Sequence, residues 1–435
     1  MIKQQGLIRA TFVIFGVVTG ALTAELEFNK FAPHPGTWPS GFYEPDKYIG
    51  WKGIPNKEGK FIKGQVASYV KMNSQGFRDK EHNAQKKDDT FRILVLGDSF
   101  VAAVEVPPEK TFPYLLEREL NLRNNKRLEV MNFGVPGFGT AQEYLTLKHY
   151  GLNYHPDFVI LNFYLGNDVR NNSLILQTKQ DGTTTDDRNM PFFLLKNGNL
   201  EELPFSIKPR DSIKQAEQAK RTRGHLRFLK DPLLDWFPNI YRYLNDYLRE
   251  KLSSRPALGH FFWTLGIINT EITERDKNTA RNELDISSDC FVYAEEYPPE
   301  WRNAWEVTKA LLLRISKELD EKRIGFLVVI APDEKELRPN AGEQEVCGKI
   351  KADLEKPERV LSKFLSESQI KYLQLVPEFR NYYALTGKTL HFPYGYEDHW
   401  NAEGHALAAK LIYRKLVDDK ILLMKQSIGD LHAPD

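Results

Sequence analysis

The stretch FRILVLGDSFVAAVEVPPEKTF, residues 91–112, runs from a series of apolar residues into the small polar cluster Gly97-Asp98-Ser99. The apolar series predicts a buried strand. The cluster that follows has two interpretations. It is either an ordinary turn, since turns use Gly, Asp and Ser constantly, or a serine nucleophile held at the carboxyl edge of a sheet. The stretch alone leaves both open, because a nucleophile needs partners from elsewhere in the chain.

The same succession of strand and helix recurs along the sequence. The predicted strands are nearly continuous apolar runs, which is typical of a parallel sheet covered on both faces. Strands are expected at 92–97, 128–134, 157–164, 326–332 and 371–377, and helices at 111–125, 140–151, 301–322, 360–368 and 401–419. This alternation predicts an α/β fold, a three-layer α/β/α sandwich with a five-stranded parallel sheet in flavodoxin-like order.

The chain divides by composition into several segments. We expect an N-terminal extension of short strands at 25–90, an α/β domain in two parts at 91–173 and 301–420, and a C-terminal tail at 421–435. Residues 174–300 form an insertion after the third strand, which is far longer than an ordinary loop. It contains one helical pattern, at 231–252. The insertion is either a lid or partner surface, or a decorated loop packed on the core.

The first 24 residues differ from the rest of the chain. Lys3 and Arg9 precede an uncharged apolar run at 10–24, which is the pattern of an export signal. The run is shorter than the roughly 20 residues that span a bilayer comfortably, so cleavage and retention as a membrane anchor both stay open. A buried N-terminal helix is the other interpretation. We expect an extracytoplasmic protein, whether periplasmic, secreted or membrane-anchored.

Composition argues against several classes of partner. Sixty basic and 59 acidic residues leave a net charge of +1 with no basic block, so nucleic acid is not expected as a partner. Cys290 and Cys347 lack metal-ligand spacing, although they could form a disulfide in an exported protein. His391 and His405 do not form a metal motif, and His405 is expected to be structural. We expect neither a metal nor a cofactor.

Four polar segments are predicted to meet at one edge of the sheet, because parallel strands end on the same side. They contain Ser99, Gly137, Asn167 and His399. Ser99 can attack a carbonyl once His399 removes its proton, and the Gly137 amide and the Asn167 side chain can stabilise the resulting oxyanion. The neighbouring Asp98 and Asp168 are expected to bind loop backbone, and Gly134 and Gly139 to be turn residues.

These segments carry a family resemblance. GDSF at 97–100, NFGVPG at 132–137, GND at 166–168 and EDHWN at 397–401 resemble, in order, the four blocks of the SGNH (GDSL-type) hydrolases. The resemblance implies that Ser99 is the nucleophile, that His399 is the base, and that Gly137 and Asn167 form the oxyanion hole. It also implies a flavodoxin-like fold and ester substrates, often acetyl groups on carbohydrate.

The acid that orients His399 departs from the family pattern. The family usually has Asp three or two residues before the histidine, whereas this chain has Tyr396 and Glu397 there and Asp398 next to it. Residues two apart in an extended segment point the same way, which favours Glu397. A tight turn would favour Asp398 instead, and a backbone carbonyl could replace both.

Three functions fit these residues. A serine esterase would transfer the acyl group from Ser99 to water. An exported polysaccharide O-acetyltransferase would transfer it to a sugar hydroxyl, and HWN at 399–401 resembles such enzymes. The third function is a catalytically silent carbohydrate-binding or assembly protein. In each case the partner is a small-molecule or carbohydrate ester, with membrane attachment possible only through the N-terminal segment.

Overall fold

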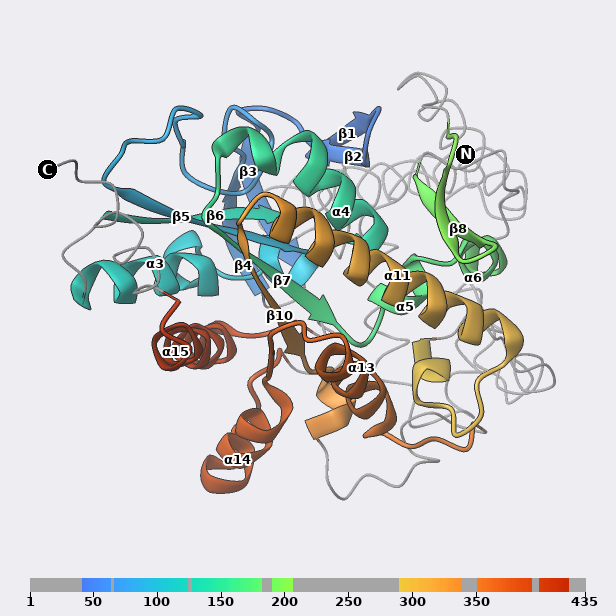
Figure 1. Ribbon diagram of the computed structural model, residues 1–435. Coiled ribbons are helices and arrows are strands. Elements are labelled where there is room, and N and C mark those ends of the chain that lie inside the picture. Colours follow the sequence, from blue (N-terminus) through green and yellow to red (C-terminus); the bar gives the residue numbers. More distant parts are fainter. Residues whose placement is uncertain are drawn as a thin grey trace, which may run out of the picture. The chain divides into compact units, whose positions relative to one another are not determined.

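A computed structural model describes most of the two parts of the α/β domain and the extension that precedes them (Figure 1). The described residues are 41–63, 66–123, 127–181, 190–205, 289–337, 350–392 and 399–421. The predicted export segment, the helix at 231–252, and Glu397 and Asp398 lie outside them. The chain forms two compact units, and all described residues except Ile62 and Lys63 belong to the unit made of 39–61, 66–209 and 285–435. The predicted domain boundaries stay predictions.

The centre of this unit is a five-stranded sheet in which every pair of neighbours is parallel. Its strands are β5 (Thr90–Gly97), β6 (Arg127–Gly134), β7 (Phe158–Tyr164), β10 (Gly325–Ala331) and β11 (Tyr372–Gln374). Their spatial order is β11-β10-β7-β5-β6, which is the flavodoxin-like order. The predicted fold class is therefore confirmed.

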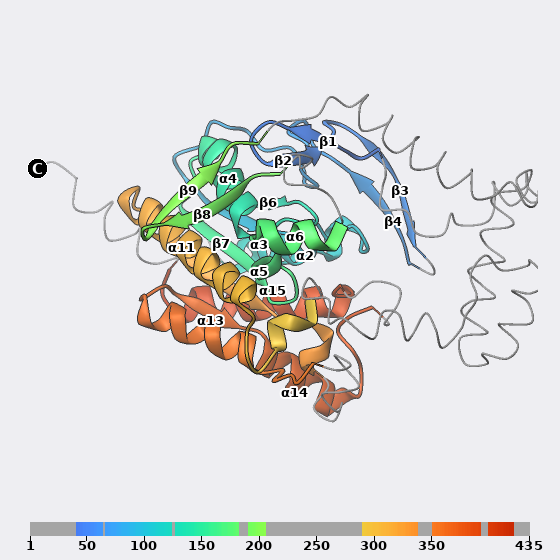
Figure 2. The same ribbon diagram turned by 90° about the vertical axis from the view of Figure 1, so that its right-hand side faces the viewer.

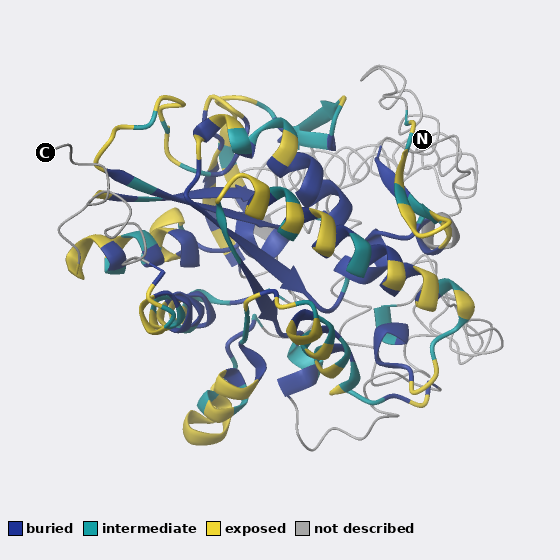
Figure 3. Ribbon diagram, in the orientation of Figure 1, coloured by how far each residue is buried: buried dark blue, intermediate teal, exposed yellow. Residues whose placement is uncertain are grey.

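Helices cover both faces of the sheet, and side chains of each strand point alternately to the two layers. In β5, Leu94 and Leu96 pack with α4 (Thr140–His149), α11 (Pro299–Glu321) and α13 (Lys356–Glu367). Ile93 and Val95 pack on the other side with α3 (Phe112–Arg123), α14 (Val376–Thr386) and α15 (Ala402–Asp418). Figure 3 shows the strands as buried and the outer faces of the helices as exposed. Because helices cover both faces of the sheet, its strands are apolar along nearly their whole length.

The described part of the extension before the sheet contains short strands (Figure 2). They are β1 (Tyr43–Asp46), β2 (Gly50–Gly53), β3 (Glu58–Lys63) and β4 (Val66–Lys71), paired β1 with β2 and β3 with β4. Phe42, Phe61, Val70 and Met72 form a small apolar cluster here, and it also includes Val104. Because Val104 lies just after the short helix that follows β5, the extension packs on the segment that leaves the carboxyl end of a core strand.

Some elements were not predicted from the sequence. The described part of the insertion contains α6 (Leu174–Asp181) and a hairpin of β8 (Phe192–Lys196) and β9 (Asn199–Leu203). Phe193 of β8 is buried against Tyr144 of α4, so this part of the insertion is packed on the core. The strand predicted at 371–377 was too long, because β11 ends at Gln374 and α14 starts at Val376. The remaining short helices are α2 (Ser99–Ala102), α5 (Asp168–Asn171), η1 (Pro108–Lys110), η2 (Gly151–Tyr154), η5 (Asp289–Tyr293) and η6 (Glu334–Leu337).

Cys290 forms a disulfide, and Cys347, the only other cysteine of the chain, lies outside the described residues. None of the helices in the described ranges combines the length and apolarity that crossing a membrane requires.

Two adjacent leucines on α11 test which face of this helix packs on the core. Leu312 is completely buried, whereas Leu313 is 46% exposed. Leu312→Ala should lower the free energy of unfolding by about 2–5 kcal/mol, because it leaves a cavity in the core. Leu313→Ala, the matched control, should change it by about 0.5 kcal/mol or less. Urea denaturation measures both, and equal losses would contradict the orientation of α11.

Candidate active site

Ser99 is the first residue of α2, directly after β5 ends at Gly97. Asp98 caps this short helix, because its Oδ1 accepts a hydrogen bond of 2.9 Å from the Phe100 amide. Gly134, at the end of β6, packs tightly against α2, and a Cβ there would lie 2.4 Å from the Ala102 nitrogen. Gly134 therefore serves close packing and not the turn predicted for it. The result is a serine held on a rigid turn, only 6% exposed.

His399 contacts Ser99 as the sequence predicted. The Ser99 hydroxyl and His399 Nε2 lie 2.7 Å apart, although the two residues are 300 positions apart in the chain. The Phe100 ring packs edge-on against the imidazole, with 5.0 Å between the ring centroids. An imidazole nitrogen at this distance can accept the serine proton.

The residues after His399 fix its position. Trp400 is completely buried among the rings of Phe100 and Phe379. Asn401 caps α15 by accepting hydrogen bonds from the amides of Glu403 and Gly404, both of 3.0 Å. Since the residues on this side of His399 are anchored, the imidazole has little freedom to leave Ser99.

Asn167 lies beside the serine. Its Nδ2 donates a 3.3 Å hydrogen bond to Asp98 Oδ2, the same carboxylate oxygen that lies 3.3 Å from Ser99 Oγ. Asn167 is half-buried and precedes α5. The side-chain amide of Asn167 can donate a hydrogen bond to a negatively charged oxygen that develops next to Ser99.

Gly137 lies on the loop after β6, with a φ of 77° that favours glycine. Asn171 of α5 donates a 3.2 Å hydrogen bond to the Gly137 carbonyl, and Trp51 Nε1 donates one of 3.1 Å to the Pro136 carbonyl. Within the described part of the chain, no group accepts a hydrogen bond from the Gly137 amide. The loop is therefore fixed from two sides while its amide is available to a ligand.

Glu105 is a site residue that the sequence analysis missed. Its Oε1 accepts a 3.0 Å hydrogen bond from His399 Nδ1, and its side chain is 3% exposed. Burial acts to raise the pKa of Glu105, but the charge and hydrogen bond of His399, the Glu105 amide and Arg78 hold it below its usual value. A signal was present in the sequence, because Glu105 is the one charged residue in the apolar run VAAVEV, and a buried charge needs a partner.

Other buried acids lie behind the serine. Asp168 Oδ2 accepts a 2.8 Å hydrogen bond from the Tyr164 amide, so the predicted structural roles of Asp168 and Asp98 are both confirmed. Burial raises the pKa of Asp98, and burial together with neighbouring acids raises the pKa of Glu143 and Asp168 well above the usual value.

The remaining histidines near the site are neutral and structural. His405 Nδ1 accepts a hydrogen bond from the Phe112 amide, and His391 Nε2 lies 3.3 Å from the Pro332 carbonyl. Burial lowers the pKa of His391 to about 4 and that of His405 to about 3. No cluster of His, Cys, Asp and Glu side chains suited to a metal ion occurs in the described ranges.

Known proteins resemble this chain only distantly. No family model and no curated protein matches the chain. Among solved structures, it is similar to the acetyl xylan esterase AlAXEase, at 12% identity and a TM-score of 0.37 over 75% of this chain and 100% of that one. A lipase/acylhydrolase from Enterococcus faecalis is 12% identical, with a TM-score of 0.34 over 75% and 95% of the two chains.

A third similar structure is a putative lipolytic protein of the G-D-S-L family from Desulfitobacterium hafniense DCB-2. It is 11% identical, with a TM-score of 0.32 over 74% of this chain and 98% of that one. At these TM-scores the fold assignment depends on the strand order of the sheet itself, and the function has to be argued from the side chains.

Proposed function

We propose that this protein is a serine esterase that acts on O-acyl esters, with acetyl groups on carbohydrate as the favoured substrates. The observation that carries the proposal is the 2.7 Å contact between Ser99 Oγ and His399 Nε2 at the carboxyl edge of the sheet. The order of the four sequence blocks, which resembles the SGNH hydrolases, supports the same chemistry.

The reaction has two steps. His399 takes the proton from Ser99 as Oγ attacks the ester carbonyl, and the alcohol leaves with that proton, so the acyl group is bound to Ser99. A water molecule then attacks the acyl carbon while His399 takes its proton, and the proton returns to Ser99 as the acid leaves. In both steps the carbonyl oxygen becomes negative, and the Gly137 amide and Asn167 Nδ2 are the donors proposed to stabilise it.

The alternative is an exported polysaccharide O-acetyltransferase with the same residues. The acyl-serine is common to both activities, and they differ in whether water or a sugar hydroxyl accepts the acyl group. A purified protein incubated with an acetyl donor and an oligosaccharide distinguishes them, because only a transferase produces acetylated oligosaccharide. A silent binding protein has no need of the Ser99–His399 hydrogen bond, and this contact is the argument against it.

An extracytoplasmic location is part of the proposal. The apolar run at 10–24 supports it, as does the disulfide at Cys290, since disulfides form in oxidising compartments. We expect the full-length protein in the periplasmic or membrane fraction, and a variant without residues 2–24 in the cytoplasm. Cell fractionation and immunoblotting measure this, and a cytoplasmic pool of the full-length protein would contradict the export proposal.

Ser99→Ala should abolish acetate release from p-nitrophenyl acetate and labelling by a fluorophosphonate probe. The reason is that Ser99 is the hydroxyl in contact with the proposed base. Ser366→Ala, on the exposed surface of α13, is the matched control and should leave both unchanged. Equal rates for Ser99→Ala and the wild type would exclude the serine mechanism.

Asn167→Ala should lower kcat much more than it raises KM. An oxyanion donor acts mainly in the transition state, and loss of one costs about 10²–10³ in kcat. Asn153→Ala, an exposed asparagine, is the control. A change confined to KM would make Asn167 a substrate-binding residue.

A further inference from the structure

The loop between α2 and η1 carries Glu105 next to the serine and the histidine. Residues 103–106 leave α2 through Ala103, which has a left-handed backbone with a φ of 47°. Val104 then enters the apolar cluster of the N-terminal extension, and Glu105 contacts His399 Nδ1 at 3.0 Å. The loop therefore alternates between contacts with the extension and contacts with the site.

We propose that Glu105 is the carboxylate that orients His399, and that Arg78 of the N-terminal extension is the residue that holds Glu105 in place. The inference depends on the proposed serine mechanism, and it assigns a different acid from the Glu397 or Asp398 that the sequence favoured.

Glu105 and Ser99 contact the two ring nitrogens of the same imidazole. The Glu105 carboxylate accepts from Nδ1, which fixes the tautomer whose Nε2 is unprotonated and can accept the Ser99 proton. When His399 becomes charged during the reaction, the carboxylate stabilises the imidazolium. Both groups that flank the histidine therefore come from a single segment, 99–105, which the end of β5 positions.

Arg78 binds the backbone on both sides of Glu105. Its Nη1 donates hydrogen bonds to the carbonyls of Ala102 and Ala103, of 3.0 and 2.6 Å, and its Nη2 donates one of 2.7 Å to Val106. The Ser68 hydroxyl of β4 donates to the carbonyl of Val104. A planar guanidinium with several donors can satisfy carbonyls that point in different directions, which a lysine ammonium does less well.

Arg78 also provides charge. It is 5% exposed, and burial lowers the pKa of Arg78 to about 10, so it is still protonated at neutral pH. Its positive charge is one of the effects that hold the pKa of Glu105 below its usual value. A buried carboxylate is stable in this place because the Arg78 charge and the hydrogen bond from His399 compensate for its burial.

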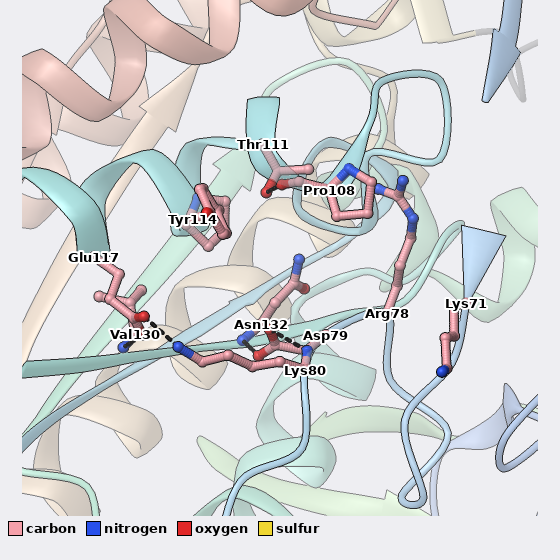
Figure 4. Close-up of a pocket in the computed structure, with 11 residues that line it drawn as sticks. Lys71, Arg78, Asp79, Lys80, Pro108, Thr111, Tyr114, Glu117, Val130 and Asn132 are labelled. Carbon is pink, nitrogen blue, oxygen red and sulfur yellow. Dashed lines mark hydrogen bonds and ion pairs between the residues drawn. The ribbon is translucent and has the colours of Figure 1, made fainter. Parts of the chain in front are cut away.

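Arg78 lines a pocket of about 250 Å³ (Figure 4). Arg78 and Lys71 line it together with Pro108, Thr111 and Tyr114. Lys71 is exposed, and its one ion pair goes to Glu58 on the neighbouring strand, so it is a cation in the same pocket without the contacts of Arg78. We expect a small cation to reach the place of the guanidinium group through this pocket.

The first experiment compares the effects on kcat of replacing each candidate acid. Glu105→Gln should lower kcat about 10²–10⁴-fold with little change in KM. The reason is that the NH2 group of glutamine can face Nδ1, where the active tautomer of His399 needs a hydrogen-bond acceptor. Loss of the negative charge should also move the acid limb of the kcat/KM profile to lower pH, because the imidazolium is less stable. Glu109→Gln, an exposed glutamate four residues on, is the matched control and should match the wild type.

Glu397→Gln and Asp398→Asn, measured in the same assay, should each lower kcat by a smaller factor than Glu105→Gln does. The assignment of Glu105 is overturned if Glu105→Gln keeps the wild-type kcat and pH profile. It is also overturned if Glu397→Gln or Asp398→Asn lowers kcat by a larger factor than Glu105→Gln. If Ser99→Ala also stays active, the serine mechanism itself is wrong. If Ser99→Ala is inactive while Glu105→Gln is normal, only the assignment of the acid fails.

The second experiment tests the role of Arg78 by chemical rescue. Arg78→Ala should lower kcat at least tenfold, and millimolar ethylguanidinium should restore part of it through the pocket. Tetramethylammonium at equal ionic strength should not restore activity. Lys71→Ala, the control in the same pocket, should have wild-type activity with or without ethylguanidinium. No rescue is expected in an Arg78→Ala, Glu105→Gln double variant, because the cation acts through Glu105.

Arg78→Lys covers the case in which Arg78→Ala does not fold. A lysine keeps the charge but cannot reach the carbonyls on both sides of Glu105, so kcat should fall by an intermediate factor with the fold intact by circular dichroism. Wild-type kcat in Arg78→Lys, or in a folded Arg78→Ala, would show that Arg78 does not position Glu105.

Discussion

The hydrogen bond between Ser99 and His399 is the interaction on which the rest of the site depends. It joins the end of β5 to the segment just before α15, and its length of 2.7 Å leaves little room for movement of either residue. Both ends are accordingly immobilised by packing. Gly134 allows β6 to approach α2, and Trp400 and Asn401 anchor the segment that carries the histidine.

The N-terminal extension is structurally part of this site. Arg78 and Ser68 bind the loop of Glu105, and Trp51 binds the loop of Gly137. Residues of the extension thus hold the loops that follow α2 and β6, which the sheet alone positions only at their first residues. A parallel sheet brings loop ends together, but the conformation of each loop has to be fixed by contacts from outside the sheet.

The sequence predicted the sheet well, because long apolar strands and helix periodicity are local signals. It also predicted the contact of Ser99 with His399, since the sequence blocks that contain these residues resemble, in order, those of a known family. It did not predict Glu105, because the family pattern places the acid close to the histidine in sequence, and distance along the chain says little about contacts made across the sheet edge. α14 was missed because Val376 and Pro377 continue an apolar strand pattern, although Pro377 suits the first turn of a helix.

The separation of 300 residues between Ser99 and His399 also determines when the two side chains can meet during synthesis of the chain. Ribosomes and export channels deliver a chain from its N-terminus, so Ser99 and Glu105 emerge long before His399. Until residue 399 has emerged, the chain holds the proposed nucleophile and the proposed orienting carboxylate without the histidine between them. A nascent chain therefore has no assembled Ser99–His399 pair until residue 399 has emerged.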